Sequence, residues 1–176
     1  MRRSRLPLLI LGFALVQPLL LPAAAAAAEG SGCAAAAWPL EAEGARLQAA
    51  GLPRLASGAT LAADSPTAFA LALVPAGEAG LPTPPERASG AGFAGFVRLA
   101  PPRQDGVLQI TLDQGAWIDL VQDGKPLKPT AFTGVRDCPL ARKSVRFSLK
   151  AGDAPVLLQV SGAAADTLRL ALTAAP

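Results

Sequence analysis

The chain has 176 residues, with 16 Lys and Arg against 13 Asp and Glu, 2 Cys, and no His or Tyr. Without His, a Ser-His-Asp triad, a Cys-His pair, an HExxH zinc site and a two-His iron centre are excluded. The remaining possibilities are binding, structural roles and the few enzyme chemistries that need no histidine.

The first 28 residues have the pattern of a secretory signal peptide. Three arginines lie within the first five positions, followed by an apolar run over Leu6–Leu21 and the small residues Ala23–Ala28. This order predicts cleavage near Ala28 and a periplasmic or secreted protein. A retained membrane anchor is the alternative. Because Pro7 and Pro18 interrupt a run that is short for a span, we expect no transmembrane segment in the mature chain.

Removal of this segment changes the charge balance. It takes away three cations and no anion, so 13 basic and 13 acidic residues remain. A protein that grips nucleic acid keeps its positive charge after processing, so we predict no nucleic-acid partner. The remaining residues suffice for one domain with its own core.

Cys33 and Cys138 are the only cysteines. An even number in an exported protein predicts a disulfide. It would close a loop of about 105 residues and contribute roughly 4–5 kcal/mol by constraining the unfolded chain. The alternative is acylation of Cys33. The preceding Gly30-Ser31-Gly32 lacks the usual aliphatic residue, which argues against it.

Residues 29–58 are rich in Ala and Gly and predict an irregular N-terminal arm. Its one strong anchor is Trp38-Pro39-Leu40. The segment Glu41–Ala50 is compatible with a short helix, which Gly44 leaves marginal. We assign residues 59–176 to the folded domain.

Short alternating segments follow from Thr67 onward, and they predict β-strands. The first alternates Phe, Leu and Ala, and Pro75–Pro85 after it predicts an extended surface loop. Seven further strands are expected: Phe93–Leu99, Val107–Leu112, Ala116–Val121, Lys125–Lys128, Ser144–Leu149, Val156–Val160 and Thr167–Leu172. Asp123-Gly124 predicts a tight hairpin turn. This spacing predicts an all-β fold, an antiparallel, jelly-roll-like β-sandwich in a single domain.

Trp117 and Asp119 form the first candidate ligand-binding site. The period of two places them on a strand face opposite the core, with Gln109 and Thr111 expected on a neighbouring strand. An indole beside such polar groups binds a sugar by stacking on its C–H groups and pairing with its hydroxyls. The alternative is that the arm or the Pro-rich loop covers this face and Trp117 is simply packed.

Arg142, Arg146 and Lys150 recur at even spacing and form the second candidate site. On one sheet face they make a positive stripe that would meet an anionic partner, such as lipopolysaccharide phosphate or an acidic protein surface. The alternative is a solvated face, or charges that protect an edge strand from aggregation.

Asp113, Asp119 and Asp123 leave two minor possibilities. They lack the alternating ligands and distal Glu of an EF-hand, so we predict no metal and no other cofactor. Glycoside hydrolysis by two carboxylates is a remote alternative, because nothing in the sequence marks a suitable pair. We therefore predict that the protein is not an enzyme.

The stretch Gly106–Leu172 resembles the bacterial pre-peptidase C-terminal type of sandwich. The matching features are the strand opening Gly106-Val107-Leu108, the strand Trp117–Val121 and the turn Ala151-Gly152-Asp153. The resemblance implies a small, secreted, non-catalytic sandwich that acts as a binding or chaperone-like appendage.

The mature chain also resembles a group of small exported bacterial proteins of unknown role. The shared features are Cys33, Trp38–Leu40, Trp117–Asp119, Cys138 and Arg142–Phe147. Some members are labelled homogentisate dioxygenase. Such an iron enzyme needs histidine ligands, which this chain lacks.

These observations predict a periplasmic or secreted, disulfide-linked, non-catalytic binding or accessory module. Its expected partner is an envelope glycan or protein. A structural envelope protein with no small ligand is the alternative.

Overall fold

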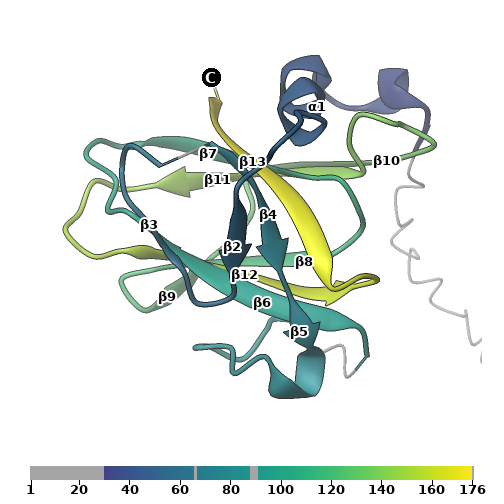
Figure 1. The fold of residues 1–176 in the computed structure, drawn as a ribbon. Coiled ribbons are helices and arrows are strands. Elements are labelled where there is room, and N and C mark those ends of the chain that lie inside the picture. The colour runs from purple at the N-terminus through teal and green to yellow at the C-terminus, as the bar shows by residue number, and fades with distance from the viewer. Residues whose placement is uncertain (1–29, 66, 88–90, 176) are drawn as a thin grey trace, which may run out of the picture.

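The computed structural model describes residues 30–65, 67–87 and 91–175. The predicted signal peptide and its cleavage point near Ala28 lie outside these residues. The described chain forms two β-sheets packed face to face, with the short helix α1 (Glu41–Leu47) on the outside (Figure 1). The predicted β-sandwich is confirmed.

The larger sheet has seven strands in the order β1-β10-β11-β7-β13-β4-β2. Their bounds are Gly30–Ser31 (β1), Ala131–Arg136 (β10), Lys143–Leu149 (β11), Gly106–Leu112 (β7), Thr167–Ala175 (β13), Ala68–Ala72 (β4) and Arg54–Ala56 (β2). The five inner strands pair antiparallel, as predicted. The short edge strands β1 and β2 instead pair parallel with β10 and β4.

The smaller sheet has the order β3-β6-β12-β8-β9, and β5 also pairs with β6. The bounds are Thr60–Leu61 (β3), Phe93–Leu99 (β6), Val156–Ala163 (β12), Trp117–Gln122 (β8), Lys125–Leu127 (β9) and Val74–Pro75 (β5). Among the described strands of this sheet, β3 alone pairs parallel with its neighbour.

The turn between β8 and β9 is the predicted hairpin. Gln122 pairs with Lys125 across it, and the intervening Asp123 and Gly124 have φ angles of 50° and 71°. Two central residues with positive φ define a type I′ turn, which matches the twist of the two strands.

The main core lies between the sheets. It is built from the inward-facing residues that the alternation predicts, including Ile110, Val145, Phe147 and Leu170, all of them buried. Large aliphatic and aromatic side chains alternate with small or polar ones along each strand, so one face of each sheet becomes apolar.

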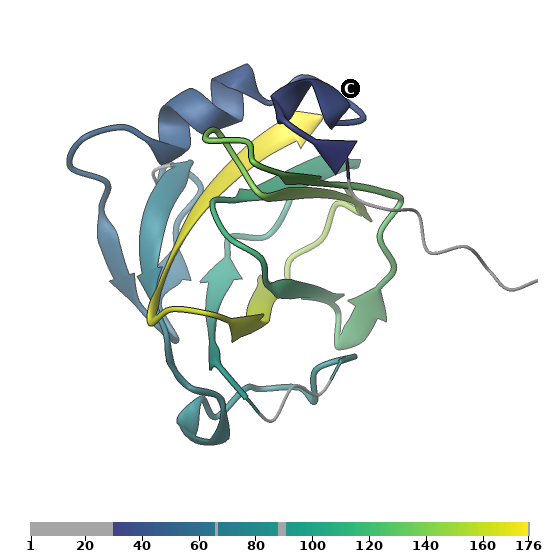
Figure 2. The same cartoon turned by 90° about the vertical axis from the view of Figure 1, so that its right-hand side faces the viewer.

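A second apolar cluster lies on the outer face of the larger sheet. There, α1 contacts β13 and β4, whose small outward residues Ala171 and Ala68 leave room for the helix (Figure 2). Leu40 and Leu47 anchor the helix, with 2% and 1% of their surface exposed. The predicted irregular arm therefore covers this sheet.

Gly44 lies where α1 approaches the segment after β10. A Cβ atom at Gly44 would lie 2.6 Å from Cβ of Leu140, so close packing requires glycine here. The helix ends at Leu47, earlier than the predicted Ala50, and Gly51 then adopts a φ of 73° that favours glycine.

The disulfide is confirmed. Cys33 begins the 3₁₀ turn η1 (Cys33–Ala35), and it is bonded to Cys138, which follows β10. The bond joins the start of the N-terminal arm to the edge of the larger sheet.

Candidate functional site

Trp117 begins β8 and is half-buried. Its Nε1 donates a hydrogen bond to Asp119 Oδ1 at 2.9 Å. The guanidinium of Arg87 lies 4.5 Å from the ring centroid, and Nζ of Lys143 lies 5.0 Å from it. Lys143 Nζ also donates to the Ala116 carbonyl at 3.0 Å. The indole ring is therefore already in contact with two cations, which leaves less of its face free to stack on a sugar.

Asp119 lies beneath the Pro-rich loop. Its Oδ1 also accepts from the Glu86 amide at 3.4 Å, and its buried Oδ2 has no partner among the described residues. Burial raises the pKa of the Asp119 carboxyl above its usual value. Next to it on β12, Gln159 exchanges hydrogen bonds of 3.0 and 3.1 Å with the backbone of Thr83. The loop segment thus bonds the side chain of Gln159 and one carboxylate oxygen of Asp119.

The polar residues expected beside Trp117 lie elsewhere. Gln109 and Thr111 belong to β7, in the other sheet, and both are buried. Thr111 Oγ1 lies 2.8 Å from Ser144 Oγ, and Gln109 Nε2 donates to Glu43 Oε1 at 3.1 Å. The expectation that Gln109 and Thr111 join Trp117 is therefore wrong, because strand pairing places β7 and β8 in opposite sheets.

The predicted positive stripe of Arg142, Arg146 and Lys150 does not form one surface either, because the three side chains have different surroundings. Arg146 faces away from the main core, but the arm covers it. Its Nε donates to Gln109 Oε1 at 2.8 Å, and its guanidinium lies 4.2 Å from the Trp38 ring centroid. Arg146 thus helps to hold the arm against the sheet.

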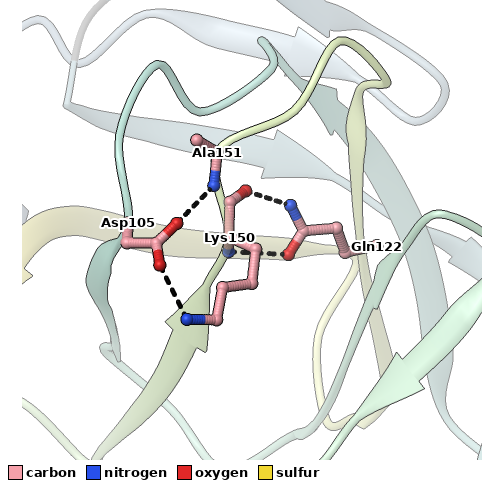
Figure 3. Close-up of polar contacts among 4 residues, drawn as sticks. All are labelled: Asp105, Gln122, Lys150 and Ala151. Atoms are coloured by element: carbon pink, nitrogen blue, oxygen red, sulfur yellow. Dashed lines mark hydrogen bonds and ion pairs between the residues drawn. The ribbon is translucent and has the colours of Figure 1, made fainter.

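Lys150 forms part of a junction between the two sheets (Figure 3). Its Nζ pairs with Asp105 Oδ2 at 2.6 Å, and Asp105 Oδ1 accepts from the Ala151 amide at 2.8 Å. The hydrogen bond from Lys150 lowers the pKa of the Asp105 carboxyl. The side chain of Gln122, at the end of β8, bonds both backbone N and O of Lys150. This contact ties β8 to the end of β11.

Two of the predicted site residues, Arg142 and Trp117, line the same cavity. It has a volume of about 570 Å³ and lies between the start of β8 and strands β10 and β11. We call this cavity the cationic groove. Its charged and aromatic lining residues are Arg87, Lys128, Arg142, Lys143, Trp117 and Phe132, and none of the described residues that line it is acidic.

Four of these residues, Arg87, Lys128, Lys143 and Phe132, were not among the predicted site residues. Arg87 and Lys128 are isolated cations in Pro-containing segments, with no sequence pattern that links them to Trp117. Phe132 lies on β10, where no strand was predicted, and 67% of its surface is exposed. Among the described residues, Phe132 is the one large hydrophobic side chain that is exposed, and it lines the same groove as the four cations.

The carboxylates considered for catalysis have different surroundings. Asp113 Oδ1 accepts from the Arg169 amide at 3.0 Å, and burial raises the pKa of its carboxyl. Asp123 lies in the β8–β9 turn, about 13 Å along the strand from Asp119. Within the described ranges, no group of three or more His, Cys, Asp or Glu is placed to hold a metal ion.

Comparisons with protein-family models, with curated proteins and with solved structures found no match. The resemblance to the pre-peptidase C-terminal type of sandwich therefore stays a prediction. In the part of the chain that the structure describes, no helix is long and apolar enough to cross a membrane. The Cys33–Cys138 disulfide is compatible with a location outside the cytoplasm.

Proposed function

We propose that this protein is a periplasmic or secreted, non-catalytic binding module that holds an anionic partner in the cationic groove. The observation that carries the proposal is the gathering of four cations and two aromatic rings in one groove whose described lining residues include no acidic one. The predicted mature chain has equal numbers of charges of each sign, so this concentration is local. It would attract and orient an anion.

The indole ring of Trp117 contributes by placing cations. Interactions of Arg87 and Lys143 with the ring are worth about 0.5–1 kcal/mol each at a partly exposed site. The hydrogen bond from Trp117 to Asp119 fixes the ring in turn. A site whose cations are already ordered loses less side-chain entropy when an anion binds.

A structural envelope protein without a small ligand is the second candidate. The observation that favours it is the coverage of both outer sheet faces by the chain itself. The arm covers the larger sheet, and Thr83 of the Pro-rich loop and the adjoining Glu86 contact the smaller one. Among the described residues, the arm adds none to the lining of the cationic groove, and the loop segment adds only Arg87, next to Glu86. The rest of the groove is left uncovered, which distinguishes the two candidates.

The test compares two charge reversals on the same hairpin. Lys128 and Lys125 are both exposed, but only Lys128 lines the groove. Calorimetry would measure the binding of lipopolysaccharide fragments, uronic-acid glycans and acidic peptides to the oxidised protein. For the anion that binds, we expect Lys128→Glu to weaken affinity about tenfold, Lys125→Glu to change it less than twofold, and added salt to weaken it. No binding across the panel, or equal effects of both reversals, would favour the structural role.

A further inference from the structure

One strand edge of the smaller sheet opens into the cationic groove. β9 pairs with β8 only at Leu120, Val121 and Gln122. Gln122 and Lys125 flank a two-residue turn, so their backbones form a hydrogen-bonded pair. Hydrogen-bonded and non-bonded pairs alternate along an antiparallel ladder. The N–H and C=O groups of Leu120 therefore also point toward β9, and those of Ile118 point to the same side. Among the described residues, no strand meets Ile118 on that side.

The position of Pro126 agrees with this pattern. Pro126 lies opposite Val121, at a pair that the alternation leaves without hydrogen bonds. Proline has no N–H to donate, so it fits only at such a position. β9 then ends at Leu127, and the groove begins where β9 would continue along β8.

Phe132 lies on a part of the larger sheet that the smaller sheet does not cover. Phe132 pairs with Val145, whose side chain faces the core, so Phe132 points to the same side of the larger sheet. It is nevertheless 67% exposed, and β10 makes at most weak contact with the described strands of the smaller sheet. A strand added to β8 beside Ile118 would lie over Phe132 and bury it.

We propose that the cationic groove binds an extended peptide segment of a partner protein, in which acidic and apolar residues alternate. The segment adds to β8 as a strand that pairs with Ile118. This inference rests on the proposed function, that the groove holds an anionic partner, and names the class of that partner.

The chemistry of the groove matches such a segment. Successive side chains of a strand point to opposite faces of the sheet. Residues on the outer face meet the cations at the Trp117 ring, Arg87 and Lys143, and residues on the inner face meet Phe132. Main-chain hydrogen bonds provide affinity in strand addition, and the alternate side chains provide specificity.

An acidic glycan matches the groove less well. The Trp117 ring is already in contact with two cations, which leaves less of it for stacking on a sugar. The polar groups of the adjacent face, Asp119 and Gln159, are bonded to the Pro-rich loop. The edge of β8 at Ile118, which pairs with no described strand on the side of the groove, has no corresponding role in sugar recognition.

The probe is a capped hexapeptide in which Glu and Val alternate, measured by fluorescence anisotropy with the oxidised protein. Its control is the isomer with three Glu followed by three Val. We expect the alternating peptide to bind at least tenfold more tightly. Two further peptides carry N-methyl groups, one at the odd-numbered and one at the even-numbered backbone nitrogens. Only one of these two frames, or sets of N–H groups, faces β8. We therefore expect methylation of that set to abolish binding and methylation of the other set to change it less than twofold. Equal effects of the two frames would overturn strand addition.

Phe132→Ser provides a second measurement. We expect it to weaken peptide binding at least tenfold, whereas Lys125→Glu changes it less than twofold. Because Phe132 is exposed, the variant should unfold at the wild-type temperature. Binding of a uronic-acid glycan that depends on Lys128, without peptide binding, would overturn this inference and leave the proposed function standing. Self-association that Phe132→Ser abolishes, again without peptide binding, would assign the edge to a second copy. If no anion binds, the proposed function fails as well.

Discussion

Removal of the disulfide tests how the N-terminal arm is held. Cys33 and Cys138 are 105 positions apart. A cross-link that closes a loop of this length constrains the unfolded chain by about 4.7 kcal/mol in the chain-entropy model. Replacing both residues (Cys33→Ser with Cys138→Ser) should lower the free energy of unfolding by roughly this amount.

The folded state should change little in this variant. Leu40 and Leu47 remain anchored in the second apolar cluster, and burial of each leucine contributes about 1.5–3 kcal/mol. The arm should therefore stay docked without the disulfide. The surface exposed on unfolding is then nearly the same, and the dependence of the free energy on urea, the m-value, should be preserved.

Urea unfolding of the oxidised wild type and the double variant measures both quantities. With an m-value of about 2 kcal/mol/M, the midpoint should fall by roughly 2 M. Reduced wild type serves as the control and should match the variant. A loss below about 2 kcal/mol at an unchanged m-value would refute the entropic reasoning. A lower m-value would show that the arm detaches before the rest unfolds.

Three further variants test the side-chain roles. Burial raises the pKa of the Asp119 carboxyl in the folded state, so the folded state binds this proton more tightly than the unfolded chain does. The free energy of unfolding should therefore fall as the pH rises from below about 4, the ordinary pKa of Asp, through the raised pKa of the folded state. Asp119→Asn keeps an acceptor for Trp117 Nε1 and should flatten this decline in urea titrations at several pH values. Gln122→Ala should cost about 1–3 kcal/mol in thermal unfolding, because it leaves the backbone N and O of Lys150 without their partner. Arg146→Ala should lower stability by about 1–2 kcal/mol and leave anion affinity in calorimetry unchanged, whereas a loss of affinity would contradict its assignment to the arm.

Strand positions were largely predictable from the sequence. The structure places β6 at Phe93–Leu99, as predicted, and the β8–β9 hairpin turns at Asp123-Gly124. These features depend on local chemistry, since alternation of apolar side chains selects an extended backbone with one buried face and Asp-Gly accommodates two positive φ angles. The pairing of Cys33 with Cys138 followed from the cysteine count.

Other elements lacked a local signal. The sequence did not predict β10, because apolar and polar residues do not alternate along it. Its Phe132 is exposed although it lies on the face of the sheet that is elsewhere buried in the core. Gly44 suggested a weak helix, yet it permits the close approach of α1 to Leu140. In both cases a neighbour distant in sequence determines the role of the residue.

The sequence by itself determined the β-sandwich class, most strands and the disulfide, because periodicity, turn residues and cysteine number are properties of the chain alone. Only the tertiary structure decided which predicted site residues meet. It separated Arg146 and Lys150 from Arg142, and it joined Arg142 with Trp117, Lys128 and Phe132 in one groove. The physical reason is that strand order and sheet edges arise from long-range pairing. The alternation along a single strand specifies which way a side chain points, but not what lies opposite it.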